Sequence, residues 1–238
     1  MQYRMSRLVA GPFLRLLARA TVIGAEHVPD IGPAIMASNH LSVIDSIYLP
    51  LMLPRPVTFA AKSEYFTGTR LRDRVVSAYL RSTNQLSTDR NGGRAAQEML
   101  EAAVTHLRSG ELFGIYPEGT RSPDGRLYRG RTGVGYLALN SGAPVIPVAM
   151  IGTDKILPPG HKVPRPGRIE IRIGKPIEFA EFAGQTAGAR QRRTVTDTVV
   201  RAIQELSGQE YVPIYASVRK EELAATAAAN GHAPAQTS

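Results

Sequence analysis

Apolar, β-prone runs recur along the chain between segments with a helical pattern. The first four are nearly continuous in apolar residues and predict buried strands, whereas the alternation in the fifth predicts a half-exposed strand. The five runs are residues 33–38 (PAIMAS), 57–61 (VTFAA), 112–116 (LFGIY), 144–150 (PVIPVAM) and 168–174 (RIEIRIG).

Helical patterns lie between and after these runs. Residues 94–108 predict the clearest helix, which Gly110 ends; residues 132–141 predict another, closed by Gly142, and residues 190–206 a third. Strands and helices in alternation imply an α/β domain with a central, largely parallel sheet flanked by helices. Active groups in such folds lie in loops beyond the strand ends. The inner stripe of the first helix is predicted to contain Ala95, Met99, Ala102, Ala103 and Leu107.

The two ends of the chain differ from the predicted domain at residues 22–220. Residues 4–19, within an N-terminal segment at 1–21, place apolar side chains on one helical side and four arginines on the other. This pattern is typical of an amphipathic helix that contacts an anionic membrane surface, although a surface helix packed on its own domain has the same pattern. No window reaches the ~18 apolar residues of a membrane-spanning helix. Residues 221–238, alanine-rich and then polar, are predicted to be poorly ordered.

Composition narrows the functional classes. The net charge of +9 favours an anionic partner: nucleic acid, a membrane surface or a phosphorylated small molecule. The positive residues are spread over many elements without a nucleic-acid-binding motif, so we predict no nucleic-acid partner. The absence of cysteine excludes disulfides, thiolate metal ligands and a cysteine nucleophile. No H-E-x-x-H or comparable cluster is present, so no metal site is predicted.

The stretch SNHLSVIDS, residues 38–46, combines a histidine and an aspartate in an otherwise apolar and hydroxyl-bearing segment. Five helical residues rotate by about 140°, so His40 and Asp45 can meet only if His40 lies outside the helix. Ser42 is a good N-cap candidate, and Asp45 would then reach back to free backbone N–H groups. A helix cap explains Ser42 and Asp45 without any chemistry, but it leaves His40 without a role.

A second segment, YPEGTRS at residues 116–122, follows directly on a predicted buried strand. It brings backbone N–H groups, the hydroxyl of Thr120 and the guanidinium of Arg121 into one small volume, a combination that suits a phosphate. The alternative is a β-turn with a surface Glu and Arg. Because His40 and Glu118 both follow apolar strands, we expect them to face one cleft at the same edge of the sheet.

Together, NHLSVID and YPEGTRS resemble the N-H-x4-D and P-E-G-T-R-S blocks of the glycerophospholipid acyltransferases of the lysophosphatidic acid acyltransferase type. APVIPVAM at 143–150 and IRIGKPI at 171–177 are similar to two further strands of that family, so the resemblance covers roughly residues 22–180. It implies that residues 22–220 form an acyltransferase domain and that His40 is a general base oriented by Asp45. Direct attack on an acyl thioester, from acyl-CoA or acyl carrier protein, then needs no acyl-enzyme and no cofactor.

The resemblance also implies the residues that bind the substrates. The acceptor is a lysophospholipid or a glycerol phosphate, with Arg121 expected on its phosphate. Lys62 stands where the family often has a lysine near the phosphate, although a surface lysine is the alternative. Arg90 fits the family's intermediate arginine, but its polar neighbours depart from the pattern. Pro147 and its strand resemble the family element that lines the acyl-chain region. An ordinary core strand is the alternative interpretation of the same residues. The expected acceptor-binding residues are Lys62, Arg90, Glu118, Gly119, Thr120 and Arg121.

The implied reaction converts 1-acylglycerol 3-phosphate into phosphatidic acid at the cytoplasmic face of the cell membrane, through peripheral or monotopic attachment. Glycerol 3-phosphate and other lysophospholipids remain open as acceptors. Hydrolysis of acyl thioesters or phosphoesters is the competing class, because a base beside an anion pocket could also direct water. The sequence has no G-x-S-x-G elbow, which disfavours a serine esterase of that type.

Overall fold

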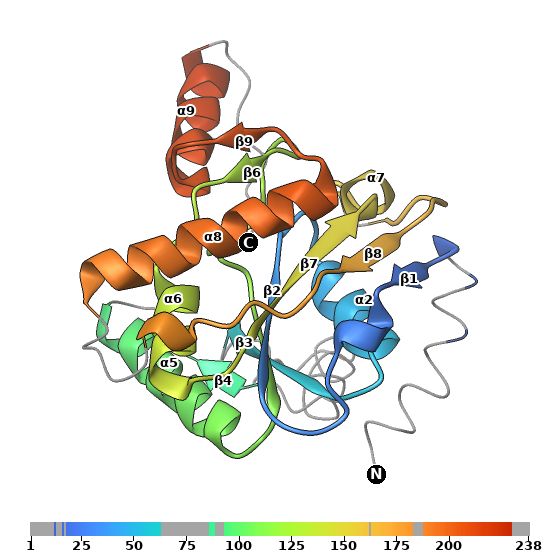
Figure 1. The fold of residues 1–238 in the computed structure, drawn as a ribbon. Helices are drawn as coiled ribbons and strands as arrows, with labels where there is room; N and C mark the ends of the chain where they lie inside the picture. The colour runs from blue at the N-terminus through green and yellow to red at the C-terminus, as the bar shows by residue number, and fades with distance from the viewer. Residues whose placement is uncertain are drawn as a thin grey trace.

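The computed structural model describes residues 12, 16, 18–62, 86–88, 93–161, 163–182 and 188–229; for residues 61, 62, 86–88 and 93 it describes the backbone alone. Figure 1 shows a central sheet with helices on both faces. Helix α8 crosses the front of the sheet, and α2 lies behind it.

The central sheet has seven strands in the order β1-β8-β7-β2-β5-β3-β4. Within the described residues, all neighbouring pairs of this sheet are parallel except β7 with β8. A separate pair, β6 with β9, is also parallel. The bounds are β1 Thr21–Ile23, β2 Ala34–Ser38, β3 Val57–Lys62, β4 Leu86–Thr88, β5 Leu112–Ile115, β6 Leu127–Tyr128, β7 Val145–Ile151, β8 Glu170–Ile173 and β9 Tyr211–Val212.

Helices connect and cover these strands. The α-helices are α2 Asp45–Met52, α5 Gly93–Arg108, α6 Gly133–Ser141, α7 Thr153–Ile156, α8 Ala189–Ser207 and α9 Ala216–Ala229, and the short 3-10 helices are η1 Ala25–His27 and η2 Ala180–Phe182. Helix α6 ends at Gly142, whose φ of 70° is the left-handed conformation that a glycine adopts readily at a helix C-terminus.

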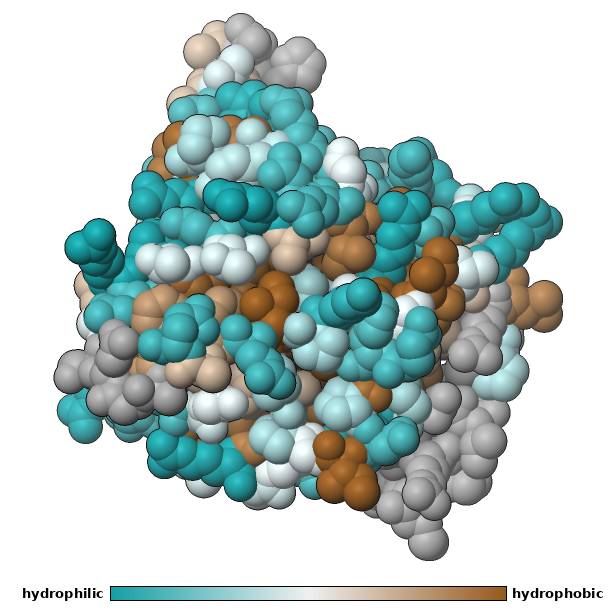
Figure 2. Space-filling view, viewed as in Figure 1, coloured by the Kyte–Doolittle hydropathy of each residue, from teal (hydrophilic) through white to brown (hydrophobic). Residues whose placement is uncertain are grey.

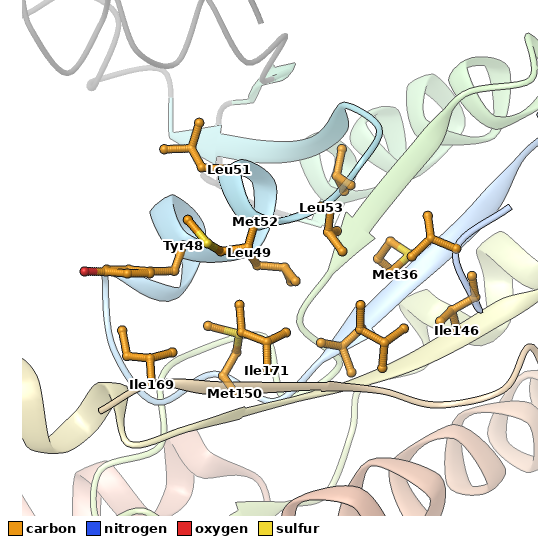
Figure 3. Packing of buried hydrophobic residues seen from close by; sticks show 14 of the residues in the cluster. Met36, Tyr48, Leu49, Leu51, Met52, Leu53, Ile146, Met150, Ile169 and Ile171 are labelled. Atoms are coloured by element: carbon orange, nitrogen blue, oxygen red, sulfur yellow. The ribbon is translucent and has the colours of Figure 1, made fainter. Parts of the chain in front are cut away.

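Two hydrophobic clusters form, one on each face of the sheet. The strand period of two sends Met36 of β2 towards α2, whereas Ile35 and Ala37 face the helices α5, α6 and α8. Figure 3 shows Tyr48, Leu49, Leu51 and Met52 of α2 above Met150 of β7 and Ile171 of β8, with Met36 of β2 to their right. All five residues of β2 are buried, so this strand is the centre of the fold.

The strand and helix predictions are confirmed for all five apolar runs and for the three predicted helices. The half-exposed character of the fifth run is also confirmed, because the residues of β8 alternate between partly buried and buried. One position of the predicted helical stripe is wrong. Ala102 is exposed. The buried side of α5 is formed by Ala103, Val104 and Leu107, and Ala102 lies beside it.

Predictions at the chain ends have different outcomes. The expected disorder from residue 221 is wrong as far as residue 229, because α9 continues through these residues. Its first turn packs on the domain, where Ala216 is buried. Residues 230–238 lie outside the described part, as does most of the amphipathic helix predicted at 4–19.

The surface drawn in Figure 2 is mostly hydrophilic, with hydrophobic side chains in scattered patches. None of the described helices is both long and apolar enough to cross a membrane.

Candidate active site

His40 and Asp45 form a hydrogen-bonded pair at the end of β2. His40 lies in the loop after the strand, Asp45 opens α2, and His40 Nδ1 is 2.9 Å from Asp45 Oδ2. The same Oδ2 accepts hydrogen bonds from the backbone N–H groups of Leu41 (2.7 Å) and Ser42 (2.8 Å). If Nδ1 donates in this contact, the lone pair of a neutral His40 lies on Nε2.

The helix cap differs in part from its prediction. Asp45 does reach back to free backbone N–H groups, but Ser42 is not the N-cap. The helix starts after Ile44, without a side-chain cap, and the Ser42 hydroxyl donates to the backbone oxygen of Leu157 at 2.7 Å. Asp45 accepts from the N–H groups that precede the helix, those of Leu41 and Ser42, so no serine cap is needed there.

The ring of His40 is held by an aromatic stack. Its centroid lies 3.9 Å from that of Tyr116, with an angle of 11° between the ring planes. Tyr116 in turn stacks on Phe59, and its hydroxyl lies 3.0 Å from the Ser46 hydroxyl. The imidazole is therefore fixed by Asp45 on its edge and by Tyr116 on its face, with 16% of the side chain exposed.

Glu118 connects the second motif to the first through the backbone. Its Oε1 accepts from the N–H of His40 at 3.2 Å, and its Oε2 accepts from the N–H of Tyr128 at 3.0 Å. The N–H of Ser122 donates to the backbone oxygen of His40 at 2.7 Å, so the 118–122 loop holds both polar backbone groups of His40. The predicted meeting of His40 and Glu118 at one sheet edge is confirmed.

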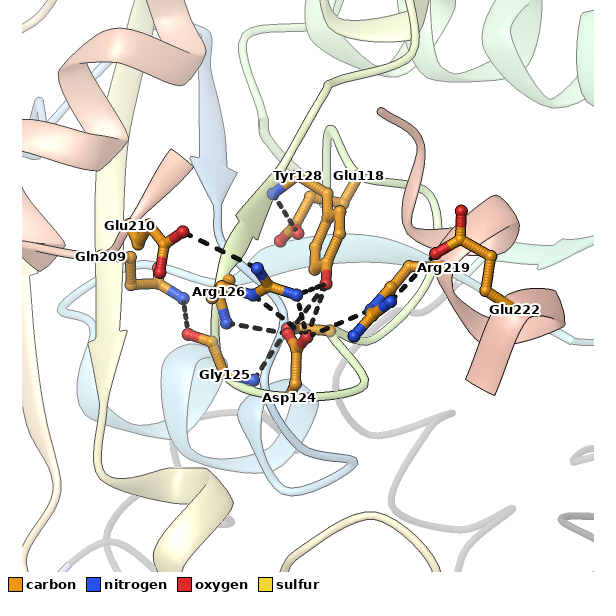
Figure 4. Close-up of polar contacts among 10 residues, drawn as sticks. Glu118, Asp124, Gly125, Arg126, Tyr128, Gln209, Glu210, Arg219 and Glu222 are labelled. Atoms are coloured by element: carbon orange, nitrogen blue, oxygen red, sulfur yellow. Dashed lines mark hydrogen bonds and ion pairs between the residues drawn. The ribbon is translucent and has the colours of Figure 1, made fainter. Parts of the chain in front are cut away.

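The ionisation of Glu118 reflects its burial. Burial raises the pKa of Glu118 to about 8, although the hydrogen bonds from the Tyr128 and His40 N–H groups act in the opposite direction. The side chain is 1% exposed, and Figure 4 shows it directed to the backbone of Tyr128. Its contacts in the structure are those of a residue that positions His40. A direct contact with an acceptor stays a prediction.

Gly119 gives the loop its turn. Its φ is +73°, and its N–H donates to the oxygen of Tyr116 at 2.9 Å. A Cβ on Gly119 would lie 3.0 Å from Cδ of Arg131, so both the backbone conformation and the space favour glycine. This turn places Thr120 and Arg121 at the end of the loop, where both side chains are partly exposed.

Three further predicted residues have separate outcomes. Lys62 ends β3 at the carboxyl edge of the parallel strands, the edge that also carries His40 and Glu118, but its side chain is outside the described part. Arg90 also lies outside the described residues. Pro147 is buried in β7 opposite Ala37, beside Gly174, as a core residue is; contact with an acyl chain stays a prediction.

Asn39 was not assigned a role from the sequence. Its amide oxygen accepts from the N–H of Met150 at 2.7 Å, and its amide nitrogen donates to the oxygen of Met150 at 3.0 Å. The amide nitrogen also donates to Gln209 Oε1 at 2.7 Å, and Gln209 Nε2 donates to the oxygen of Gly125 at 2.6 Å (Figure 4). The sequence signal for this role was a polar residue directly after a strand of buried residues, because a buried amide needs hydrogen-bond partners.

Lys220 is a second unassigned residue at the site. It extends from α9, and its Nζ donates to Thr120 Oγ1 at 2.6 Å. No motif marks it, and it lies 100 residues from Thr120. For metal binding, no group of three or more His, Asp or Glu residues within the described ranges has a suitable arrangement.

A base beside a carboxylate, joined to a loop rich in anion-binding groups, is an arrangement suited to acyl transfer onto a phosphorylated alcohol. A family model described as Acyltransferase matches residues 19–151, more than half of the chain, and includes both motifs. The chain therefore belongs to this acyltransferase family.

Individual relatives agree with this membership. The chain is 30% identical over 168 residues to "1-acyl-sn-glycerol-3-phosphate acyltransferase LPAT1, chloroplastic" of Arabidopsis thaliana, a match that covers 70% of this chain and 44% of that protein. It is 27% identical over 199 residues to a Bacillus subtilis 1-acyl-sn-glycerol-3-phosphate acyltransferase, covering 82% of this chain and 92% of that protein. The chain spans less than half the length of the Arabidopsis relative.

A solved structure shares the fold. The 1-acyl-sn-glycerophosphate (LPA) acyltransferase PlsC from Thermotoga maritima superposes with a TM-score of 0.67 at 28% sequence identity. The superposition covers 86% of this chain and 79% of the Thermotoga chain. The α/β fold predicted from the alternating elements is thereby confirmed.

Proposed function

We propose that this chain is a 1-acylglycerol-3-phosphate O-acyltransferase. It would transfer a fatty acyl group from an acyl thioester to the free hydroxyl of 1-acylglycerol 3-phosphate, giving phosphatidic acid for phospholipid synthesis. The observation that carries the proposal is the His40–Asp45 pair fixed by hydrogen bonds to the 118–122 loop. The similarity to several proteins named for this activity supports it.

In the proposed reaction, His40 Nε2 takes the proton of the acceptor hydroxyl as its oxygen attacks the thioester carbonyl carbon. The new C–O bond forms, the carbonyl oxygen becomes an oxyanion, and Asp45 stabilises the imidazolium through the 2.9 Å contact with Nδ1. The tetrahedral intermediate then collapses, the C–S bond breaks, and the leaving thiolate takes the proton from Nε2. No acyl-enzyme and no cofactor are required.

The acceptor phosphate is proposed to bind at the 118–122 loop. Arg121 makes no hydrogen bond or ion pair with any residue the structure describes, and a guanidinium can bind two phosphate oxygens at once. Lys62 and Arg90 remain proposed further contacts; Lys62 is supported by its place at the same sheet edge.

Membrane contact is proposed because the lysophospholipid acceptor and the phosphatidic acid product reside in a bilayer. Val43, between His40 and Asp45, is 47% exposed, and Leu16 of the predicted amphipathic segment is 82% exposed. These apolar side chains and the net charge of +9 support peripheral or monotopic attachment to an anionic membrane surface, proposed to be the cytoplasmic face. Removal of residues 1–20 is expected to weaken binding to anionic vesicles; unchanged binding would contradict a role for this segment.

The activity is tested by incubating purified protein with acyl-CoA and 1-acylglycerol 3-phosphate while free thiol and phosphatidic acid are both measured. We expect the two products in equal amounts. Thiol release without acylated lipid would indicate a hydrolase instead. A parallel assay with acyl carrier protein as the acyl carrier, and with glycerol 3-phosphate as acceptor, identifies the preferred substrates.

A further inference from the structure

The start of α9 lies against the 118–122 loop. Besides the 2.6 Å contact of Lys220 with Thr120, Arg131 Nη2 donates to the Ser217 hydroxyl at 3.3 Å, and the guanidinium of Arg131 lies 5.2 Å from the centroid of the Tyr215 ring. Because Arg131 also packs next to Gly119, one side chain connects the turn of the loop to the start of α9.

A polar network holds the same turn of α9 from the other side. Asp124 accepts hydrogen bonds from Arg126 (2.6 Å) and Tyr128 (2.8 Å) and lies 3.7 Å from Arg219, which binds Glu222 within α9 (Figure 4). Lys220 follows Arg219 directly. These contacts therefore hold the backbone of Lys220 near Thr120.

Lys220 and Arg121 are two neighbouring cations at the 118–122 loop. Glu118, whose charge acts on Lys220, uses both of its oxygens for backbone N–H groups, and Asp124 accepts hydrogen bonds from Arg126 and Tyr128. Neither cation makes an ion pair with the residues whose placement is described. Burial lowers the pKa of Lys220 and the charge of Arg121 lowers it further, whereas Glu118 has a smaller effect in the opposite direction. Two neighbouring, partly buried cations that form no ion pair are costly, and a bound anion would relieve that cost.

The groups around this pair suit a phosphate monoester. The Thr120 hydroxyl lies next to the Lys220 ammonium, and the backbone N–H groups of Thr120 and Arg121 have no hydrogen-bond acceptor in the described part of the chain. Two cations, a hydroxyl and two N–H groups match the number and charge of the oxygens of a phosphate dianion better than those of an uncharged glycerol.

We propose that Lys220 binds the acceptor's phosphate together with Arg121 and thereby makes this chain select phosphate monoester acceptors over uncharged ones. The proposal rests on the proposed function and deepens it: α9, outside the residues that match the family, contributes a specificity-determining side chain.

The test compares the wild-type chain of residues 1–238 with Lys220→Gln, Lys220→Arg and Lys175→Gln. Lys175 is an exposed lysine after β8, so its variant loses the same charge from the surface. The KM and kcat are measured with varied 1-acylglycerol 3-phosphate, with varied uncharged 1-acylglycerol and with varied acyl-CoA. Thermal unfolding midpoints confirm that each variant folds.

We expect Lys220→Gln to raise the KM for 1-acylglycerol 3-phosphate by about 10- to 100-fold, the range for loss of one charged hydrogen bond, with the KM for acyl-CoA unchanged. Selectivity for the phosphorylated over the uncharged acceptor should fall by the same factor. Lys220→Arg should restore most of it, and Lys175→Gln should match the wild type.

Three results would overturn the proposal: an unchanged KM for the phosphorylated acceptor in Lys220→Gln, an equal loss with both acceptors, or an effect confined to acyl-CoA. Failure of the proposed function has a different signature, in which the wild type acylates no acceptor. In that case, calorimetric binding of glycerol 3-phosphate to the wild type and Lys220→Gln decides the question. Equal affinity overturns the proposal, and binding weakened in Lys220→Gln supports the site.

Discussion

The backbone N–H of His40 donates to the carboxylate of Glu118, a residue 78 positions further along the chain. The contact joins the loops after β2 and β5, which are neighbouring parallel strands. A side chain of the second motif thus holds the backbone of the candidate base, and its own carboxyl group is buried.

Replacing Glu118 by Ala removes the acceptor of two N–H groups, those of His40 and Tyr128. We expect the free energy of unfolding to fall by about 1–3 kcal/mol for each group left without a partner. The kcat should fall because the loop carrying His40 loses its support. Urea unfolding followed by steady-state kinetics measures both effects. Wild-type kcat in a folded Glu118→Ala protein would contradict the positioning role.

The raised pKa of Glu118 predicts a pH dependence of stability. Between its usual value near 4.5 and about 8, the folded protein retains a proton that the unfolded chain releases. The free energy of unfolding contributed by this group is therefore greatest below pH 4.5 and decreases as pH rises towards 8. The free energy of unfolding of wild type and Glu118→Gln is measured in urea between pH 5 and 8. In the difference between the two proteins, the contributions of the other titrating groups cancel. Parallel profiles for the two proteins would exclude the effect.

Asp45→Asn retains an oxygen that can accept from the N–H groups of Leu41 and Ser42, but it loses the negative charge beside His40. We expect a small change in stability and a large decrease in kcat, because the imidazolium is no longer stabilised. The His40→Ala variant sets the lower limit, with a loss of about 10²- to 10⁴-fold. Full activity in either variant, measured as thiol release coupled to lipid acylation, is incompatible with the proposed base.

Asn39→Ala leaves both the N–H and the oxygen of Met150 without their partner in the residue that follows β2. We expect a loss of about 1–3 kcal/mol in the free energy of unfolding. Asn39→Asp is the matched variant: it keeps the acceptor for the Met150 N–H but places a carboxylate oxygen against the Met150 oxygen. Chemical unfolding should find it destabilised as well. A neutral Asn39→Asp would indicate that the amide donor contributes little.

Alanine at Gly119 and at Gly142 separates the strain of a positive φ from the steric contact of a new Cβ with a neighbouring side chain. Gly119 and Gly142 have similar positive φ values of 73° and 70°, but a Cβ meets Arg131 only at Gly119, and Gly142 has nothing within 4 Å. Both alanine variants should lose about 1 kcal/mol for the backbone conformation. Only Gly119→Ala should also raise the KM for the phosphorylated acceptor. An equal KM in the two variants would show that the loop tolerates the methyl group.

Local sequence patterns were sufficient to predict much of the fold. The strands carried continuous or alternating apolar runs, and α6 ended at a glycine, so their periodicity and end signals were visible in short windows. The extent of α9 was not predictable in this way. Its alanine-rich sequence has no apolar stripe, and its start is held by contacts of Arg131 and Asp124 with residues near its N-terminus.

The candidate site was predictable where residue type and position after a strand coincided, as for His40, Asp45 and Glu118. The partner of Ser42 was not, because the oxygen of Leu157 is brought near by the chain path after β7. Lys220 carries no local signal at all. Lys220 contacts Thr120 because α9 packs against the 118–122 loop, whereas Lys175 is exposed. The sequence around the two lysines does not reveal this difference.

The connections at the site span long stretches of chain: 78 residues from His40 to Glu118, 111 from Asn39 to Met150 and 170 from Asn39 to Gln209. Such pairings form only after large loops have closed, which makes them late events in folding. A partly folded chain would contain the histidine and the aspartate without a working arrangement around them. During refolding, the recovery of acyl transfer should therefore lag behind the recovery of helical signal, so turnover reports when the last distant segments have docked.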